Sequence, residues 1–140
     1  MKVTKEMTFD AAHMLSNYQG KCMNLHGHTY RVQATLVGDI RENGNEQGMV
    51  VDFNTLKEFM EAIIKPLDHA ILFSDNKYRS AAEDELKRWA EKFDMSFAVI
   101  PDGKSTSENI ALYIKQKIKS HTGYDSFVKV WETPTSFAEA

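Results

Sequence analysis

The chain has 140 residues, a formal net charge of −3 and a hydrophobic content of 42%. These values predict one globular domain spanning residues 1–140. The acidic balance argues against a nucleic-acid-binding protein, which needs a basic surface stripe, but it leaves room for a small anionic substrate that needs only a few local cations.

The N-terminal residues and the single cysteine indicate the compartment. No apolar h-region follows Met1, so we expect no signal peptide. No apolar run approaches membrane-spanning length, so we expect no membrane partner. Cys22 cannot form an internal disulfide, and a free thiol fits a reducing environment, which predicts a cytoplasmic protein.

Two strands are predicted on either side of a histidine-rich loop. Apolar residues alternate with polar ones from Val3 to His13, and the same alternation runs from His26 to Leu36. In each segment the histidines continue the apolar face. If the strands pair antiparallel, the end of the first lies beside the start of the second, and His13 then meets His26 and His28.

This arrangement predicts a zinc site on His13, His26 and His28. His26 and His28 are two residues apart, so both rings project from one face of a strand. Three neutral imidazoles leave a zinc ion its full charge and an open position, as in catalytic sites. One alternative is a pair of strand histidines bonded to backbone carbonyls. Another is a closed structural site with Cys22 as the fourth ligand, which spacing alone does not exclude.

After the second strand, the sequence predicts a hairpin. Asn43, Gly44 and Gly48 favour a turn. Residues 49–51 are then expected to begin a third strand.

Three amphipathic helices are predicted from the spacing of apolar residues. The first can be capped by Asp52 or Asn54 and ends at Pro66. The second covers residues 80–93, and the third begins with a capping box at residues 105–108. On the second helix we expect four charged side chains to be solvated: Glu83, Glu85, Lys87 and Arg88.

Two more strands complete the pattern. A short one covers residues 97–100, and the last covers residues 127–132, where Glu132 continues the face of Val128 and Val130. Antiparallel strands outnumber the rest, and long helices can cover one side of the sheet. The predicted class is α+β.

Two further places carry chemistry. Asp68 and His69 follow the Pro66 helix end, and at a turn an aspartate can orient an imidazole and raise its basicity, although the dipeptide is also common without a function. Glu132 is either a solvated acid at a frayed strand end or a carboxylate on a pocket floor. In the second case it accepts two hydrogen bonds from an N–H pair of a ligand.

Five short motifs lie along the chain in a fixed order. They are Phe9–His13, Cys22–His28, Leu67–His69, Thr106–Asn109 and Trp131–Thr133. In this order they resemble the 6-pyruvoyltetrahydropterin synthase family, over about residues 3–137. The short gap between Cys22 and His26 resembles the bacterial, carboxy-forming branch of queuosine (7-deazaguanine) biosynthesis. Residues 74–104 match least, because shorter members lack most of that segment.

The resemblance implies a role for each motif residue. The implied zinc ligands are His13, His26 and His28. The implied base is Cys22, with Asp68 and His69 as its acid–base partners. The implied pterin-binding residues are Glu132, Thr106 and Ser107, and Glu132 also has an implied catalytic role. For the triphosphate, the sequence offers Lys21, Arg31 and Lys104 as candidate cations.

The resemblance also implies a fold and a reaction. The fold is the tunnelling fold: an antiparallel sheet with helices on one face, whose subunits form a β-barrel as a homo-oligomer, a trimer or hexamer with active sites between subunits. The reaction is that of a zinc-dependent lyase, which converts 7,8-dihydroneopterin triphosphate to 6-carboxy-5,6,7,8-tetrahydropterin, acetaldehyde and triphosphate. Two alternatives remain: the pyruvoyl-forming synthase, which eliminates triphosphate without losing carbon, and a non-catalytic zinc-binding module.

Overall fold

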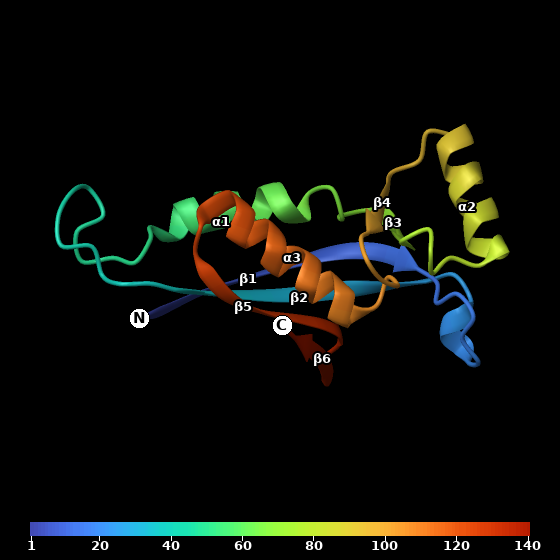
Figure 1. The fold of residues 1–140 in the computed structure, drawn as a ribbon, viewed down its shortest axis with the longest axis horizontal. Helices are drawn as coiled ribbons and strands as arrows, with labels where there is room; N and C mark the ends of the chain where they lie inside the picture. Colours follow the sequence, from blue (N-terminus) through green and yellow to red (C-terminus); the bar gives the residue numbers. More distant parts are fainter.

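A computed structural model describes residues 1–140, which form six strands, three α-helices and one short 3₁₀ turn. The strands are β1 (Lys2–His13), β2 (His26–Val37), β3 (Ala70–Ser74), β4 (Phe97–Ile100), β5 (Asp125–Thr133) and β6 (Ser136–Glu139). The helices are α1 (Phe53–Ile64), α2 (Ala81–Lys92) and α3 (Ser107–Thr122), with η1 (Lys21–Met23) between β1 and β2. Figure 1 shows α1 and α3 over the long strands and α2 at one end of the molecule.

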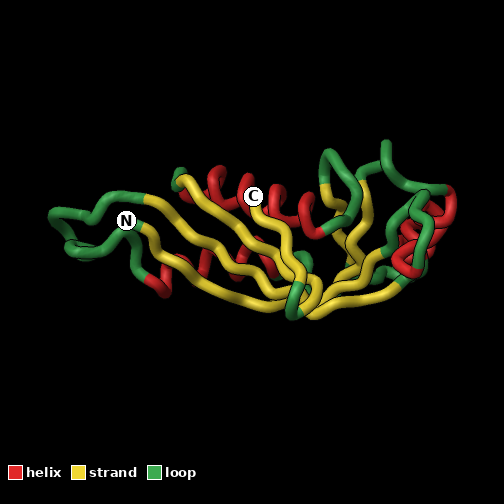
Figure 2. Tube along the Cα trace, turned by 90° about the horizontal axis from the view of Figure 1, so that it is seen from below, coloured by secondary structure: helices red, strands yellow, loops and turns green.

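The strands form one mixed sheet in the order β4-β3-β1-β2-β5-β6. Three neighbouring pairs are antiparallel, whereas β1–β3 and β3–β4 are parallel. Parallel neighbours need a crossover, which α2 provides between β3 and β4. The sheet curls strongly along its length (Figure 2). The predicted α+β class is confirmed, and the parallel edge is the feature that the alternation pattern did not contain.

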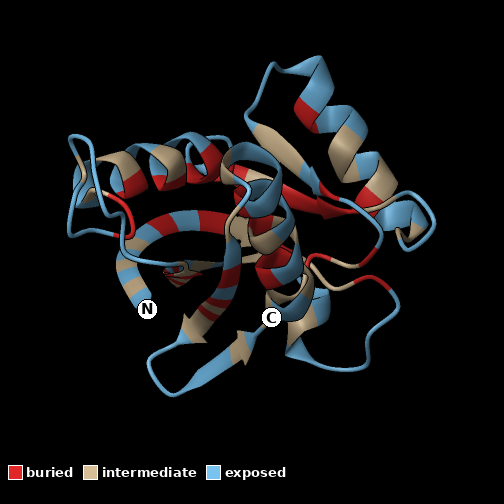
Figure 3. Cartoon of the chain, turned by 60° about the vertical axis from the view of Figure 1, so that its left-hand side comes forward, coloured by how far each residue is buried: buried red, intermediate tan, exposed pale blue.

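The predicted pairing of the first two strands is confirmed in its register. β1 and β2 are antiparallel, with His13 opposite His26 and Ala11 opposite His28. Buried and exposed positions alternate along both strands, as Figure 3 shows for the curved ribbon of β1. The pair therefore has an inner face, which contains Phe9 and Tyr30, and an outer face of polar side chains.

Helices α1 and α3 cover the inner face and complete the core. Asp52 caps α1 as predicted, because its carboxylate accepts the N–H groups of Asn54 and Thr55 at 2.7 and 3.4 Å. Apolar residues on one stripe of each helix are buried against the sheet. Gly123 ends α3 at φ 74°, a left-handed conformation that favours glycine. No helix is long and apolar enough to span a bilayer.

The predicted third strand at residues 49–51 is wrong. The segment between β2 and α1 is a loop, held by backbone hydrogen bonds that join Arg41 to Gly48 and Met49 at 2.9 Å. A hairpin strand had no place to pair, because β1 and β5 already occupy both edges of β2. Val50 and Val51 are buried instead as loop residues.

Two predictions about helix surfaces also need correction. Glu83 is not solvated: it is fully buried, and its partners are described below. On the predicted apolar side of α2, Ala90 is buried, whereas Trp89 and Phe93 are exposed. The expected capping box does not form at Ser105 either. Helix α3 begins one residue later, with Thr106 as an N-cap that makes no side-chain capping bond.

Candidate metal centre and active site

The three predicted zinc ligands converge at one end of the β1–β2 pair. His13 is buried, His26 and His28 are half-buried, and one nitrogen from each ring lies within 4.8 Å of the others. The ring centroids are 4.6 to 5.1 Å apart. The register causes this, because His13 faces His26 directly and His28 follows two residues later on the same face.

Backbone carbonyls fix the orientation of two of these rings. The His13 Nδ1 lies 2.5 Å from the Ser105 carbonyl oxygen, and the His26 Nδ1 lies 2.7 Å from that of Asn24. A carbonyl only accepts, so each Nδ1 carries a proton, and in the neutral ring each Nε2 then presents a lone pair. The two Nε2 atoms nevertheless face one another at 3.1 Å. Two acceptors at this distance repel unless a cation lies between them.

A metal ion fits this arrangement better than a proton. Burial, the largest cause, and the nearby His26 and His28 lower the pKa of His13 from 6.5 to about 4. The Nε2 of His28 is buried and has no hydrogen-bond partner in the protein. Three converging imidazole nitrogens, two of them fixed by carbonyls on their other nitrogen, are a donor set that suits zinc.

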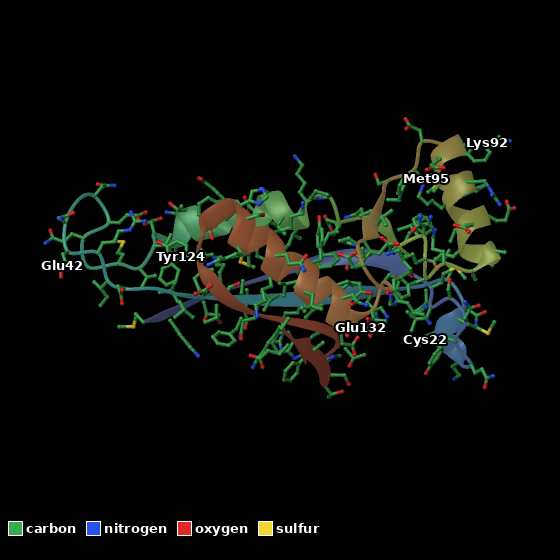
Figure 4. The ribbon with its side chains drawn as sticks, viewed as in Figure 1. Cys22, Glu42, Lys92, Met95, Tyr124 and Glu132 are labelled. Carbon is green, nitrogen blue, oxygen red and sulfur yellow. The ribbon has the colours of Figure 1, made fainter.

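Cys22 lies apart from the histidine nitrogens. It is half-buried in η1, and its sulfur is not in the group of ligand atoms that gather within 4.8 Å. The loop before it is closed by a hydrogen bond from the Leu15 N–H to the Cys22 carbonyl, at 2.8 Å. Figure 4 shows Cys22 at the same end of the molecule as the strand ends that carry the histidines. This placement disfavours a closed site with a fourth thiolate ligand.

Glu132 lies beside the histidines, close to the start of α3. Its pKa is raised, chiefly by burial and also by Glu108, while His28, His26 and the Ser107 N–H favour the charged form. Glu132 is half-buried, so the residue is not a solvated strand end. Figure 4 shows Glu132 at the N-terminal end of α3. Glu132, Ser107 and the N-cap Thr106 thus gather on one side of the histidine cluster.

Tyr30 was not predicted as a site residue. It is fully buried, its ring is 5.4 Å from that of His28, and its hydroxyl has no partner. Burial, followed by the charge of Glu132, raises its pKa. The signal was present in the sequence, because Tyr30 continues the alternation of His26 and His28 on the inner face.

Asp68 and His69 lie on the opposite side of the sheet from the zinc ligands. The Asp68 carboxylate accepts the Asp10 N–H at 2.9 Å and is 2.9 Å from His69 Nδ1. Asp10 and Thr29 face each other across β1 and β2, and both point to the outer face because their neighbours point inward. One chain therefore does not bring this pair to Cys22. An open pocket of about 670 Å³ next to His69 is lined by Gly27, Met95 and Ser96 among others.

The candidate cations for a triphosphate are in different settings. Arg31 lies on the outer face with its guanidinium carbon 4.0 Å from the centre of the Trp131 ring. The Lys104 Nζ donates to the Ser16 carbonyl at 2.8 Å. Lys21 is exposed in η1, next to Cys22.

The chain is similar to known proteins over nearly its whole length. The family model for 6-pyruvoyl tetrahydropterin synthase matches residues 2–140. A 6-carboxy-5,6,7,8-tetrahydropterin synthase of Haemophilus influenzae is 37% identical, over 99% of this chain and 96% of its own length. One of that name from Rickettsia bellii is 30% identical over 99% of both chains. The Caenorhabditis elegans 6-pyruvoyl tetrahydropterin synthase structure has a TM-score of 0.68 and 27% identity, over 100% of this chain and 94% of its own.

Proposed function

Because the chain belongs to the 6-pyruvoyl tetrahydropterin synthase family, we propose that it is a zinc-dependent carbon–carbon lyase of queuosine biosynthesis. Its substrate is 7,8-dihydroneopterin triphosphate, and its products are 6-carboxy-5,6,7,8-tetrahydropterin, acetaldehyde and triphosphate. The names of the Haemophilus and Rickettsia relatives support the carboxy-forming reaction. The free thiol of Cys22 supports a cytoplasmic location.

One observation carries the proposal: the Nε2 atoms of His13 and His26 face one another at 3.1 Å while their Nδ1 atoms are committed to carbonyls. His13, His26 and His28 hold the zinc ion in this proposal. When bound, the ion polarises the side-chain hydroxyls of the substrate and makes the adjacent C–H bond more acidic. The fourth position stays open for the substrate, because Cys22 lies outside the ligand group.

Cys22 is the general base of the proposed reaction and removes the proton from the side-chain carbon. Asp68 holds His69 through its Nδ1, so the other ring nitrogen is free to exchange a proton with the substrate. Since Asp68 and His69 lie on the outer face, they act on a substrate held by a neighbouring copy. The proposal therefore includes a homo-oligomer, a trimer or hexamer, with active sites between subunits.

Glu132 binds the pterin ring. Its carboxylate is half-buried, and the nearby Ser107 N–H favours its charged form. A carboxylate has about four lone-pair sites, so it can accept the 2-amino group and the ring N–H of the pterin. Thr106 and Ser107 at the start of α3 lie next to this carboxylate and contact the same ring.

Product analysis by mass spectrometry tests the proposal. The zinc-loaded protein is incubated with 7,8-dihydroneopterin triphosphate, and acetaldehyde, triphosphate and pterin products are measured. Stoichiometric acetaldehyde and 6-carboxytetrahydropterin are expected. Triphosphate with a pyruvoyl product and no acetaldehyde would replace the reaction with that of the pyruvoyl-forming synthase. Bound zinc without any product would favour a non-catalytic zinc module.

A further inference from the structure

Nearly all the buried polar side chains of the protein lie in one cluster between α2 and the metal centre. Six polar or charged residues are buried, and five of them belong to this cluster: His13, Ser16, Ser74, Glu83 and Ser105. Polar groups remain buried only where hydrogen bonds satisfy them. A cluster of this kind therefore fixes the positions of the segments that it joins.

The carboxylate of Glu83 is the centre of the cluster. Glu83 is fully buried, and no lysine or arginine forms an ion pair with it. One oxygen accepts the Ser74 N–H at 2.6 Å, and the other accepts the Ser16 hydroxyl in a short hydrogen bond. A buried carboxylate without a cation is unfavourable. Both of its bonds lead to segments outside its own helix.

The position of Glu83 in α2 makes this orientation unusual. Ser80 caps the helix, and its hydroxyl accepts the Glu83 N–H at 3.3 Å. In a capping box the glutamate at this position returns to the N–H of the capping residue. Here the Ser80 N–H donates to the hydroxyl oxygen of Ser16 at 2.8 Å instead. Helix capping therefore does not explain the direction of the Glu83 carboxylate.

One branch of the cluster leads to a zinc ligand. The Ser74 hydroxyl accepts the N–H of Ser105 at 3.2 Å. The Ser105 carbonyl accepts the Nδ1 proton of His13 at 2.5 Å. Glu83 holds the Ser74 backbone, Ser74 holds the Ser105 amide, and Ser105 sets the tautomer and the angle of the His13 ring.

A second branch leads to the loop that carries Cys22. Ser16 lies next to Leu15, whose N–H donates to the Cys22 carbonyl at 2.8 Å. The Ser16 carbonyl in turn accepts the Lys104 ammonium at 2.8 Å. The bond from Ser16 to Glu83 therefore anchors this loop to α2 at the point where it leaves β1.

We propose that Glu83 is a positioning residue: its buried carboxylate fixes, through Ser74, the carbonyl that orients His13 and, through Ser16, the loop that presents Cys22. This inference rests on the proposed function for the roles of His13 and Cys22. It also assigns a role to residues 74–104, the segment that matches the family least. Through Ser74 and Glu83, that segment supports the site from behind.

Single-hydroxyl variants separate the two branches without removing the carboxylate. Ser74→Ala should weaken zinc binding by about tenfold, measured by competition with a chromophoric chelator, because the carbonyl that holds His13 loses its support. Ser16→Ala should leave zinc binding unchanged but lower kcat by about tenfold, with little change in KM, because the Cys22 loop is displaced. Its rate of Cys22 alkylation by iodoacetamide should also change.

Variants of Glu83 test the centre directly. Glu83→Ala should show both defects. Glu83→Gln should recover much of the zinc affinity, because its amide oxygen can still accept the Ser74 N–H. Glu85→Gln is the matched control, since Glu85 is exposed on the same helix and pairs with Arg88. The control should match the wild type in every assay.

The inference would be overturned if folded Ser74→Ala and Ser16→Ala showed the same zinc affinity, kcat and alkylation rate as the wild type. A lowered melting temperature as their only change would also overturn it, because it would mean a merely structural role. If Glu83→Ala does not fold, these two variants decide. A wild-type protein that binds no zinc or makes no product contradicts the proposed function instead. In that case the alkylation rate of Ser16→Ala still tests the loop branch.

Discussion

The two faces of the β1–β2 pair each carry a group of three potential metal ligands, and the groups differ in what surrounds them. The inner face carries three histidines whose Nε2 atoms receive no hydrogen bond from a donor in the protein: His13, His26 and His28. The outer face carries Asp10, Asp68 and His69, all exposed. The same strands place both groups, because successive side chains point to opposite faces.

The potential metal-ligand atoms of the outer group already have hydrogen-bond partners within the protein. Asp10 accepts the Thr29 hydroxyl at 2.5 Å, and Asp68 binds the Asp10 N–H and the His69 ring. The Asp10 N–H, the largest cause, and His69 lower the pKa of Asp68, and Asp68 raises that of His69. The outer group thus contains a preformed Asp68–His69 hydrogen-bonded pair, whereas the inner group lacks partners for its Nε2 atoms. Nearness of ligand atoms alone does not distinguish the two.

The largest expected effect comes from removing one inner ligand. His28→Ala should bind less than a tenth of the zinc of the wild type and give no detectable product, because two histidines are too few for a stable zinc site. The fold should persist, since the His28 Nε2 makes no hydrogen bond within the protein. Metal content by inductively coupled plasma mass spectrometry measures this. Asp68→Asn is the outer-face control and should keep its zinc; loss of zinc from that variant alone would reverse the assignment.

Removal of the proposed base should separate metal binding from turnover. Cys22→Ala should keep one zinc per chain, because its sulfur lies outside the ligand group. Its kcat should fall by about 10²- to 10⁴-fold, the usual contribution of a general base. Steady-state kinetics and metal analysis on the same preparation measure both. A Cys22→Ala protein without zinc would favour the closed structural site.

A smaller loss is expected on the outer face. His69→Ala should keep its zinc and lose about 10²-fold in kcat, since a proton-transfer group is absent. Because His69 is proposed to act on a neighbouring copy, mixed oligomers of His69→Ala and Cys22→Ala should recover part of the activity. Unfolding the two variants together and refolding them forms such mixtures. Mixtures no more active than either parent would place all catalytic groups within one chain.

The last effect is on stability and has opposite signs on the two faces. Without metal, the lowered pKa of His13 means that the unfolded chain binds a proton more readily than the folded one between pH 6.5 and about 4. The free energy of unfolding should therefore fall as the pH falls through this window, by up to about 3 kcal/mol. The raised pKa of His69 acts the other way: its contribution is present at low pH and is lost as the pH rises through its folded value.

Urea unfolding of the metal-free protein at pH 5 and pH 7 measures these slopes. Between pH 7 and pH 5, the free energy of unfolding of His13→Gln should fall much less than that of the wild type. The free energy of unfolding of His69→Gln should still fall on acidification. An unchanged pH dependence in His13→Gln would mean that a different group is buried in its neutral form.

The alternation of apolar and polar residues along β1 and β2 was enough to predict the inner face of this strand pair. It placed His13 opposite His26, and the register confirmed it. It could not place Asp68 and His69, because their side of the sheet depends on the turn after α1, where His69 adopts φ 56°. Nor could it reveal that Glu83 is buried, since its partners Ser16 and Ser74 lie outside its own helix. The missed strand β3 is short and pairs in parallel through crossovers, which leave no local signature.

X-ray absorption at the zinc edge of the resting protein tests the metal site most directly. Three imidazole nitrogens at about 2.0–2.1 Å and one further light ligand are expected, with no sulfur. A sulfur neighbour at about 2.3 Å would make Cys22 a ligand and would contradict the open catalytic site. A protein that takes up no zinc would contradict the site itself.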